Sequence, residues 1–297
     1  HTSLLWVFEG VTSYYDDLAL VRSGMIEANS YLELLGQTIT RVQRGSGRRR
    51  QSVAESSFDA WTKFYKQDAN AANAIVSYYA KGSLVALVTD LKLRAETDGK
   101  MSLDDVMKAA WQRWGETGAG MPEDGFEELC ADMAGFDIRD FLDAAVRGTG
   151  ELPLESLLHA HGIELHLRRS QGASDKGGKP PGNGNLPDAW LGADLHASNG
   201  KLSFKVVHNG GPAERAGVAP GDEFVALDGL RVTAAGAEAR TRRYKPGDKS
   251  ELSVFRGDEL MTLQLKWDEA PADTCYLLLA DDADDRALAL RKDWLGA

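Results

Sequence analysis

The chain has 297 residues, 43% hydrophobic and 27% charged, which is ordinary for a globular protein long enough to form two domains. Its formal net charge of −11 at pH 7 argues against nucleic acid as the main partner, and no apolar run approaches the length of a membrane span. The two cysteines are far apart in the sequence, so a disulfide framework is not expected, and they leave the compartment open.

The first predicted element is a helix over residues 4–26, which carries one carboxylate, Glu9, in its apolar N-terminal part. A bare buried carboxylate costs several kcal/mol unless a cation or a hydrogen-bond donor meets it. A metal ion, a neighbouring arginine or a solvent-facing edge of the helix would each remove that cost, and the residues alone leave the three open. The apolar stripe expected to face the core consists of Leu5, Phe8, Tyr15, Leu18 and Met25.

Residues 30–44 are predicted to form a second helix and residues 52–70 a third. The aromatic side chains of the third helix recur at helical spacing, which is more typical of a core or a cleft wall than of a cofactor site. They are Phe58, Trp61, Phe64 and Tyr65.

Residues 75–87 predict a strongly apolar helix that contains the sequence Tyr-x-Lys-Gly, in which Tyr79 is the tyrosine. A phenol with a pKa of about 10 keeps its proton at neutral pH and can donate to a developing oxyanion. The alternative is a core tyrosine with a satisfied hydroxyl group. Tyr78 is the less favoured candidate for a catalytic role, and Lys81 could be a supporting charge or an exposed lysine.

The sequence WVFEGVTSYY, at residues 6–15, resembles the helix that carries the third zinc ligand in gluzincin metallopeptidases, and the glycyl aminopeptidase family in particular. This resemblance implies that Glu9 is a zinc ligand, with a water in an open position on the metal. It also implies that Tyr79 donates to the tetrahedral intermediate and that the substrates are peptides with a small N-terminal residue, Gly or Ala. Val11 stands where the family pattern has Phe. This difference affects packing and leaves the resemblance intact.

The family takes its other two zinc ligands and its general base from an HExxH motif, and this chain has none. His1 lies eight positions before Glu9 and no glutamate follows it, so it is not the second histidine of that motif. The resemblance therefore implies the C-terminal part of a bacterial protein of the cytoplasm or periplasm, with the N-terminal remainder of the same protein as its partner. We expect Zn²⁺ in the intact protein, and neither zinc nor activity in this chain alone.

The region up to residue 150 is predicted to be helical. In residues 162–168 apolar and polar side chains alternate, which predicts a strand. His159, His161 and His166 cluster here, but the last two would face opposite ways on a strand, so a shared metal site is not expected. Residues 170–185 are rich in Gly, Pro, Ser, Asn and Lys, which predicts a flexible linker.

A strand at residues 202–207, the sequence GGPAERAGV at residues 210–218 and a hairpin over residues 252–265 follow. Together they resemble a bacterial PDZ domain. The resemblance implies a loop whose backbone N–H groups bind a peptide C-terminal carboxylate while the peptide adds a strand to the sheet edge. The alternative is a domain that only packs against the helical one. The residues that match the loop are Trp190, Leu191, Gly192 and Ala193.

The sequence thus predicts a multidomain α+β protein, with an all-helical gluzincin-type catalytic subdomain over residues 1–150 and a strand with a flexible linker over residues 151–186. A PDZ domain follows over residues 187–270, and a C-terminal tail over residues 271–297 is expected to dock on another domain. The function predicted is that of the C-terminal portion of a zinc metalloaminopeptidase. The alternative is a non-catalytic PDZ adaptor with a degenerate peptidase domain, which would hold if no HExxH motif precedes His1.

Overall fold

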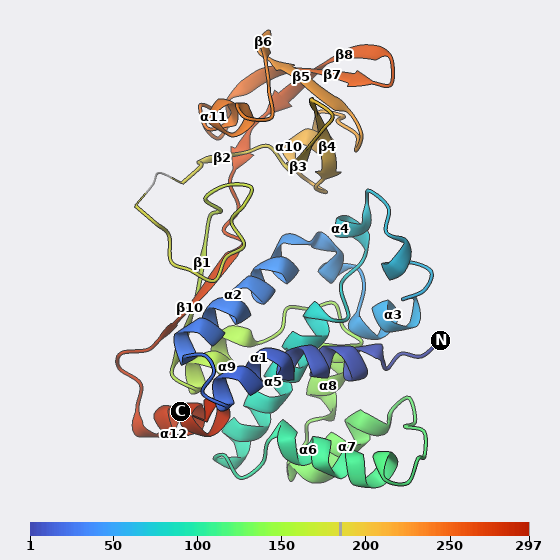
Figure 1. The fold of residues 1–297 in the computed structure, drawn as a ribbon, viewed down its shortest axis with the longest axis vertical. Coiled ribbons are helices and arrows are strands. Elements are labelled where there is room, and N and C mark those ends of the chain that lie inside the picture. The colour runs from blue at the N-terminus through green and yellow to red at the C-terminus, as the bar shows by residue number, and fades with distance from the viewer. Residues whose placement is uncertain (184–185, 297) are drawn as a thin grey trace.

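The computed structural model describes residues 1–183 and 186–296. A large helical domain and a smaller domain built around a sheet lie at opposite ends of the molecule (Figure 1). Two long strands join them, since β1 (Ile163–Arg168) pairs antiparallel with β10 (Thr274–Leu279). The chain therefore leaves the helical domain along β1 and returns to it along β10. The predicted mixture of helices and sheet is confirmed.

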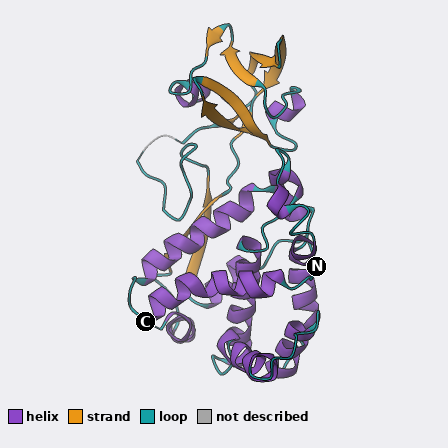
Figure 2. Ribbon diagram, turned by 45° about the vertical axis from the view of Figure 1, so that its right-hand side comes forward, coloured by secondary structure: helices purple, strands orange, loops and turns teal. Residues whose placement is uncertain are grey.

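The helical domain is built from helices of 3 to 18 residues, drawn in purple in Figure 2. The longest of them, α5 (Ala80–Thr97), is buried along almost its whole length, which fits its apolar sequence. In chain order the elements are η1 (Trp6–Val11), α1 (Thr12–Arg22), α2 (Ala28–Arg44), η2 (Ser46–Arg49), α3 (Val53–Phe58), η3 (Phe64–Lys66), α4 (Ala71–Ala74), α5, α6 (Leu103–Ala110), η4 (Trp111–Gly115), α7 (Gly125–Ala134), α8 (Arg139–Val146) and α9 (Leu154–Ala160).

The C-terminal helix α12 (Asp285–Leu295) packs into the core of the helical domain through Trp294, which is fully buried. Its indole Nε1 donates to the Tyr14 hydroxyl group at 2.8 Å, and Tyr14 donates to Asp90 Oδ2 at 2.6 Å. Arg94 Nε donates to the other Asp90 oxygen at 3.0 Å, so every polar group in this chain of contacts has a partner. The end of the chain is thereby part of the helical domain.

The smaller domain contains one antiparallel sheet in the order β3-β4-β5-β7-β8, with β6 paired to β5. The strand β3 lies at one edge, and β2 pairs separately with β9. The bounds are β2 (Ala189–Trp190), β3 (Ala193–Ser198), β4 (Lys201–Val207), α10 (Pro212–Arg215), β5 (Glu223–Leu227), β6 (Leu230–Arg231), α11 (Ala237–Thr241), β7 (Lys249–Arg256), β8 (Glu259–Lys266) and β9 (Asp268–Glu269). The predicted strand at residues 202–207 and the predicted hairpin are confirmed as β4 and β7–β8.

One buried side chain, Asn73 of α4, joins the two domains. Its Nδ2 donates to the Val207 carbonyl oxygen at 2.8 Å, and its Oδ1 accepts from the Asn209 backbone N–H at 3.0 Å. Within the helical domain the same amide group bonds to Ser46 and Asn70. All four hydrogen-bonding positions of the amide are therefore used. Two of the bonds lie within the helical domain and two reach the sheet domain, so the Asn73 side chain links the two domains.

Several predicted helix boundaries are wrong. The helix expected over residues 4–26 is π-helical in its first part and ends at Arg22, close to Gly24 with its positive φ of 72°. A π-helical turn holds more residues, which disturbs the predicted apolar stripe and leaves Phe8 52% exposed. Met25 is 76% exposed because it lies beyond the end of the helix. The helix expected over residues 52–70 ends at Phe58, and the one expected over residues 75–87 begins only at Ala80.

The predicted flexible linker is held by specific contacts in its described part. The Asp175 carboxylate pairs with Arg168 and accepts hydrogen bonds from the backbone N–H groups of Gln171 and Gly177 at 2.7 and 2.9 Å. The Gly178 N–H donates to the Cys275 carbonyl oxygen at 2.8 Å. Residues 184 and 185 of that linker lie outside the described residues.

Among the helices in the described ranges, none combines the length and the apolar character that crossing a membrane requires.

Candidate functional site

Glu9 lies in the π-helical segment η1, between the exposed Phe8 and the buried Gly10. Its side chain is half-buried, and no hydrogen bond or ion pair to it is found within residues 1–183 and 186–296. Of the three interpretations that the sequence leaves open, a neighbouring arginine therefore has no support in this part of the chain. Short π-helical segments occur often at functional sites, where they change the direction in which a side chain points.

Two glycines set the position of η1 against α5. A Cβ atom on Gly10 would lie 2.7 Å from the carbonyl carbon of Gly82, and a Cβ atom on Gly82 would lie 3.2 Å from the Cα atom of Gly10. Real Cβ atoms essentially never come as close as the first of these distances, so the backbones can touch here only without a side chain. This crossing places η1 beside residues 78–82, and so brings the segment of Glu9 to the segment of Tyr79.

Tyr79 lies immediately before α5, at the N-cap position, and is half-buried. Its hydroxyl group is hydrogen-bonded to that of Tyr65 at 3.0 Å, and the hydroxyl group of Tyr78 donates to Tyr65 at 3.0 Å. The hydrogen bond with Tyr65 and partial burial raise the pKa of Tyr79 to about 12, and the negative charge of Glu9 adds to this rise. Glu9 and Tyr79 are therefore close enough to interact electrostatically, and the phenol keeps its proton at neutral pH.

Of the aromatic residues that follow α3, Phe64 is half-buried against the core, whereas Trp61 and Tyr65 are exposed. Trp61 is 64% exposed and Tyr65 is 51% exposed, and their rings stack with centroids 5.1 Å apart. His1 packs on Phe58 with ring centroids 5.3 Å apart, and its Nδ1 lies 3.0 Å from the Phe58 carbonyl oxygen. Through Tyr65, these exposed rings adjoin the Tyr79 hydroxyl group.

Lys81 is buried, and its Nζ donates to the Arg48 carbonyl oxygen at 3.3 Å. Burial lowers the pKa of Lys81, and the nearby charge of Glu151 opposes this effect. The interpretation of Lys81 as an exposed lysine is therefore wrong. A buried ammonium group bonded to a backbone oxygen helps to hold η2 against the start of α5.

The histidines of the connecting segment do not form a shared site. His161 is fully buried with its Nδ1 2.8 Å from the Leu157 carbonyl oxygen, while His166 Nε2 lies 2.9 Å from a Glu164 oxygen. Across the described ranges, no three side chains of the His, Cys, Asp or Glu type come together as a metal site would require. Glu9, a half-buried carboxylate without an ion pair among the described residues, is free to act as a single metal ligand, and it belongs to no group of three such side chains in those ranges.

The loop predicted to bind a peptide carboxylate joins β2 to β3. Gly192 has φ of 77°, and a Cβ atom on it would lie 2.7 Å from the Pro212 ring, so only glycine fits. The Leu191 carbonyl oxygen accepts from the Ala213 N–H at 3.0 Å, which fastens the loop to the start of α10. Trp190 stacks on His208 with ring centroids 5.8 Å apart, and Ala193 begins the edge strand β3.

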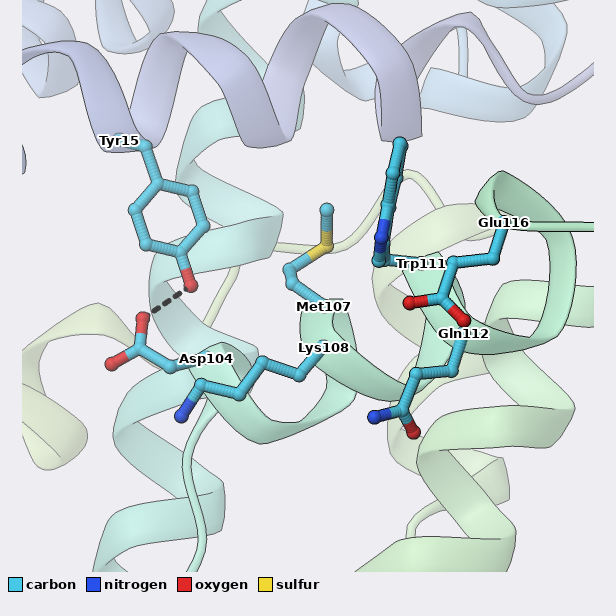
Figure 3. Close-up of a pocket in the computed structure, with 7 residues that line it drawn as sticks. All are labelled: Tyr15, Asp104, Met107, Lys108, Trp111, Gln112 and Glu116. Atoms are coloured by element: carbon cyan, nitrogen blue, oxygen red, sulfur yellow. Dashed lines mark hydrogen bonds between the residues drawn. The ribbon is translucent and has the colours of Figure 1, made fainter.

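A separate open groove of about 580 Å³ lies between α1 and α6–η4 (Figure 3). Tyr15 Oη donates to Asp104 Oδ1 at 2.7 Å, and Arg22 pairs with Asp104 at 2.9 Å. Burial raises the pKa of Asp104, but these hydrogen bonds and the charges of Arg22 and Arg94 outweigh burial and lower it. The carboxylate in this groove already has its partners, and the described lining includes neither Glu9 nor Tyr79.

Residues 1–85, which contain both Glu9 and Tyr79, match the M61 glycyl aminopeptidase family. The whole chain is similar to the crystal structure of an aminopeptidase N family protein from Idiomarina loihiensis, with 40% sequence identity and a TM-score of 0.91. The match covers 99% of this chain and 49% of that one, so the chain spans about half the length of the solved structure. These findings confirm the predicted resemblance to the C-terminal region of the glycyl aminopeptidase family.

Two further solved structures match only part of the chain. A serine endoprotease from Yersinia pestis is 18% identical over 28% of this chain and 30% of its own, with a TM-score of 0.26. A PDZ domain of a carboxy-terminal protease from Vibrio cholerae is 17% identical over 28% of this chain and 97% of its own, with a TM-score of 0.25. At such scores neither match carries an argument. No curated protein sequence is similar enough to this chain to count as a match.

Proposed function

We propose that the natural protein is a zinc-dependent aminopeptidase and that this chain supplies its third metal ligand and its oxyanion donor. The proposal rests chiefly on one observation: the Gly10–Gly82 crossing brings Glu9, a carboxylate without a partner among the described residues, to the protonated phenol of Tyr79. The match of residues 1–85 to the M61 family supports the same reaction class. Gly and Ala as the preferred N-terminal residues of the peptide belong to this proposal.

Glu9 would hold the zinc ion, which when bound supplies a Lewis acid for peptide hydrolysis. Its half-buried position keeps the carboxylate available, since no protein cation competes for it among the described residues. Tyr79 would donate its proton in a hydrogen bond to the oxygen of the scissile carbonyl as negative charge develops there. Because the Tyr79 pKa is raised to about 12, the donor stays protonated over the whole neutral range.

The test is made on the natural full-length protein, with metal content and glycyl-p-nitroanilide hydrolysis as the two measurements. We expect Glu9→Gln to lose zinc and activity together. Tyr79→Phe should keep zinc and lose about a hundred- to a thousand-fold in kcat, the usual cost of removing one oxyanion donor. Glu27→Gln and Tyr276→Phe, at positions outside this site, serve as matched controls and should behave as the unchanged protein.

A full-length protein with neither zinc nor hydrolysis would contradict the aminopeptidase and favour the non-catalytic alternative. In that case the functional part is the sheet domain, which we propose is a PDZ domain that binds peptide C-termini along β3. Two observations support this: β3 is an edge strand, and the loop before it requires glycine at position 192.

Fluorescence anisotropy of labelled peptides with the whole chain tests the peptide-binding proposal. A peptide with a free C-terminal carboxylate should bind, and the same peptide with an amidated C-terminus should bind at least about tenfold more weakly, since an ionic hydrogen-bonded contact is lost. Gly192→Ala should abolish the difference because alanine is strained at this φ. Equal binding of both peptides would contradict carboxylate recognition.

A further inference from the structure

We propose that Tyr65 is a positioning residue for the reaction, which holds the Tyr79 phenol through a chain of three tyrosine hydroxyl groups. The inference rests on the proposed function, because only there does Tyr79 donate to a substrate. Sequence analysis places Tyr65 among the aromatic residues of a helix and gives it no role of its own. The structure instead brings its hydroxyl group between those of Tyr78 and Tyr79.

The bond from Tyr78 to Tyr65 has a direction that suits this role, and in the bond between Tyr65 and Tyr79 either hydroxyl group can be the donor. Tyr78 is 1% exposed, and its hydroxyl group donates to Tyr65 Oη at 3.0 Å. Each phenol carries one proton, so the Tyr65 proton is available to the Tyr79 oxygen, 3.0 Å away. When Tyr79 donates to an oxyanion, its own oxygen becomes more negative, and Tyr65 can then donate to it. A chain of hydrogen bonds in one direction strengthens its last donor.

Ring contacts fix the geometry of the three phenols. The rings of Tyr78 and Tyr79 stack with centroids 4.6 Å apart. Phe64 packs edge-on against Tyr65 at 5.4 Å and lies 5.0 Å from the Tyr78 ring. Trp61 also stacks on Tyr65. The Tyr65 ring is therefore held in place by rings from its own segment, η3 and the turn before it.

Without substrate, the raised pKa of Tyr79 fits a bond in which Tyr79 donates to Tyr65, because a hydrogen bond that Tyr79 accepts would lower its pKa. In the proposed role the bond reverses, with Tyr65 as the donor, once Tyr79 gives its hydrogen bond to an oxyanion. The hydrogen bond with Tyr65 is the first cause of the raised pKa of Tyr79, ahead of burial and of the Glu9 charge. Burial and the hydrogen bond with Tyr65 also raise the pKa of Tyr78. Neither phenol ionises near neutral pH, so the chain keeps its protons under the conditions in which a peptidase would work.

The test compares Tyr65→Phe with the unchanged full-length protein. We expect kcat for glycyl-p-nitroanilide to fall by about three- to tenfold, the usual cost of one hydrogen bond, with KM and zinc content unchanged. The ¹³Cζ resonance of Tyr79, assigned with Tyr79→Phe, should shift because that carbon reports hydrogen bonding at its own oxygen. Tyr78→Phe should give a smaller loss in kcat, since Tyr65 keeps its bond to Tyr79, and Tyr276→Phe should change nothing.

The outcomes separate this inference from the proposed function. If the unchanged protein hydrolyses the substrate and Tyr65→Phe has the same kcat and the same Tyr79 resonance, the positioning role is overturned and the aminopeptidase stands. If the unchanged protein has no activity, both are overturned. A variant with a lower unfolding temperature and an unshifted Tyr79 resonance would assign Tyr65 to folding, and would also overturn the positioning role.

Discussion

Gly10 and Gly82 approach each other so closely that a methyl group at either position would meet the backbone of the other helix. The contact joins η1 to the first turn of α5, two segments separated by more than sixty residues of sequence. Glu9 precedes the first glycine and Tyr79 lies three residues before the second. The distance between the candidate ligand and the candidate donor is thus fixed by two residues that have no functional group.

We expect Gly10→Ala to lower the free energy of unfolding by about 1–3 kcal/mol, the usual cost of inserting a group into a closely packed contact. Chemical denaturation measures it. Gly150→Ala is the control, since a Cβ atom there meets nothing within 4 Å and its φ is negative or extended. If Gly10→Ala is as stable as the control, the two helices do not touch as described.

The sequence could indicate candidate functional residues and not the contacts between them. Glu9 and Tyr79 are recognised from short sequence patterns around each residue. Both patterns are local and do not depend on how the helices pack. The π-helical turn at Trp6–Val11 depends on which carbonyl oxygen each N–H finds after packing, so helical periodicity misses it. The same holds for Tyr65, whose partners come from another segment.

For the sheet domain, the sequence predicts the strands and turns but not the contact with the helical domain. Strands, turns and the hairpin could be predicted because alternation and Gly or Pro turns are local signals. The role of Asn73 in holding the sheet domain could not be predicted, because a single asparagine in a short polar segment is equally typical of a turn. The contact becomes visible only when Val207 and Asn209 arrive from the second domain.

We expect Asn73→Ala to loosen the joint between the domains. The change removes both interdomain hydrogen bonds and leaves the Val207 oxygen and the Asn209 N–H without that partner, at a cost of about 1–3 kcal/mol. Small-angle scattering should show a broader distribution of dimensions, and limited proteolysis should cut the connecting segments sooner.

Asn209→Ala is the matched control for the joint, because Asn209 contributes its backbone N–H and keeps it after the substitution. Its scattering curve should superimpose on that of the unchanged chain. Identical curves for Asn73→Ala and the unchanged chain would show that other contacts hold the domains together.

We expect the buried pair Arg94–Asp90 to be sensitive to the loss of one partner. Both side chains are at most 2% exposed, and Arg94 also pairs with Asp293 and Asp104. Arg94→Met leaves the Asp90 charge buried, which should cost about 3–5 kcal/mol in unfolding experiments. Arg139→Met breaks an ion pair whose side chains are about half exposed and should cost far less than Arg94→Met.

A double-mutant cycle separates the pair from the rest of the network. Arg94→Met combined with Asp90→Asn should cost less than the sum of the two single changes, because the second change removes the uncompensated charge. Additive costs would mean that Asp90 and Arg94 act independently.

The ion pair between Arg168 and Asp175 should make the stability of the connecting segment sensitive to acid. Arg168 and Asp175 are both mostly buried, and although burial raises the pKa of Asp175, the hydrogen bonds from Arg168, Gln171 and Gly177 lower it to about 2. In an unfolded chain an aspartate has a pKa of about 3.9. The folded value is the lower one, so the stabilisation is complete above about pH 4 and is lost as the pH falls toward 2.

We expect Asp175→Asn to lower the free energy of unfolding by about 2 kcal/mol at pH 6 and by progressively less as the pH falls from 4 to 2. Arg168→Met should weaken the pH dependence in the same interval, since it removes the strongest single support of the ionised carboxylate. Urea unfolding at several pH values measures both variants. Parallel stability curves for Asp175→Asn and the unchanged chain across this interval would show that the carboxylate does not carry the acid sensitivity.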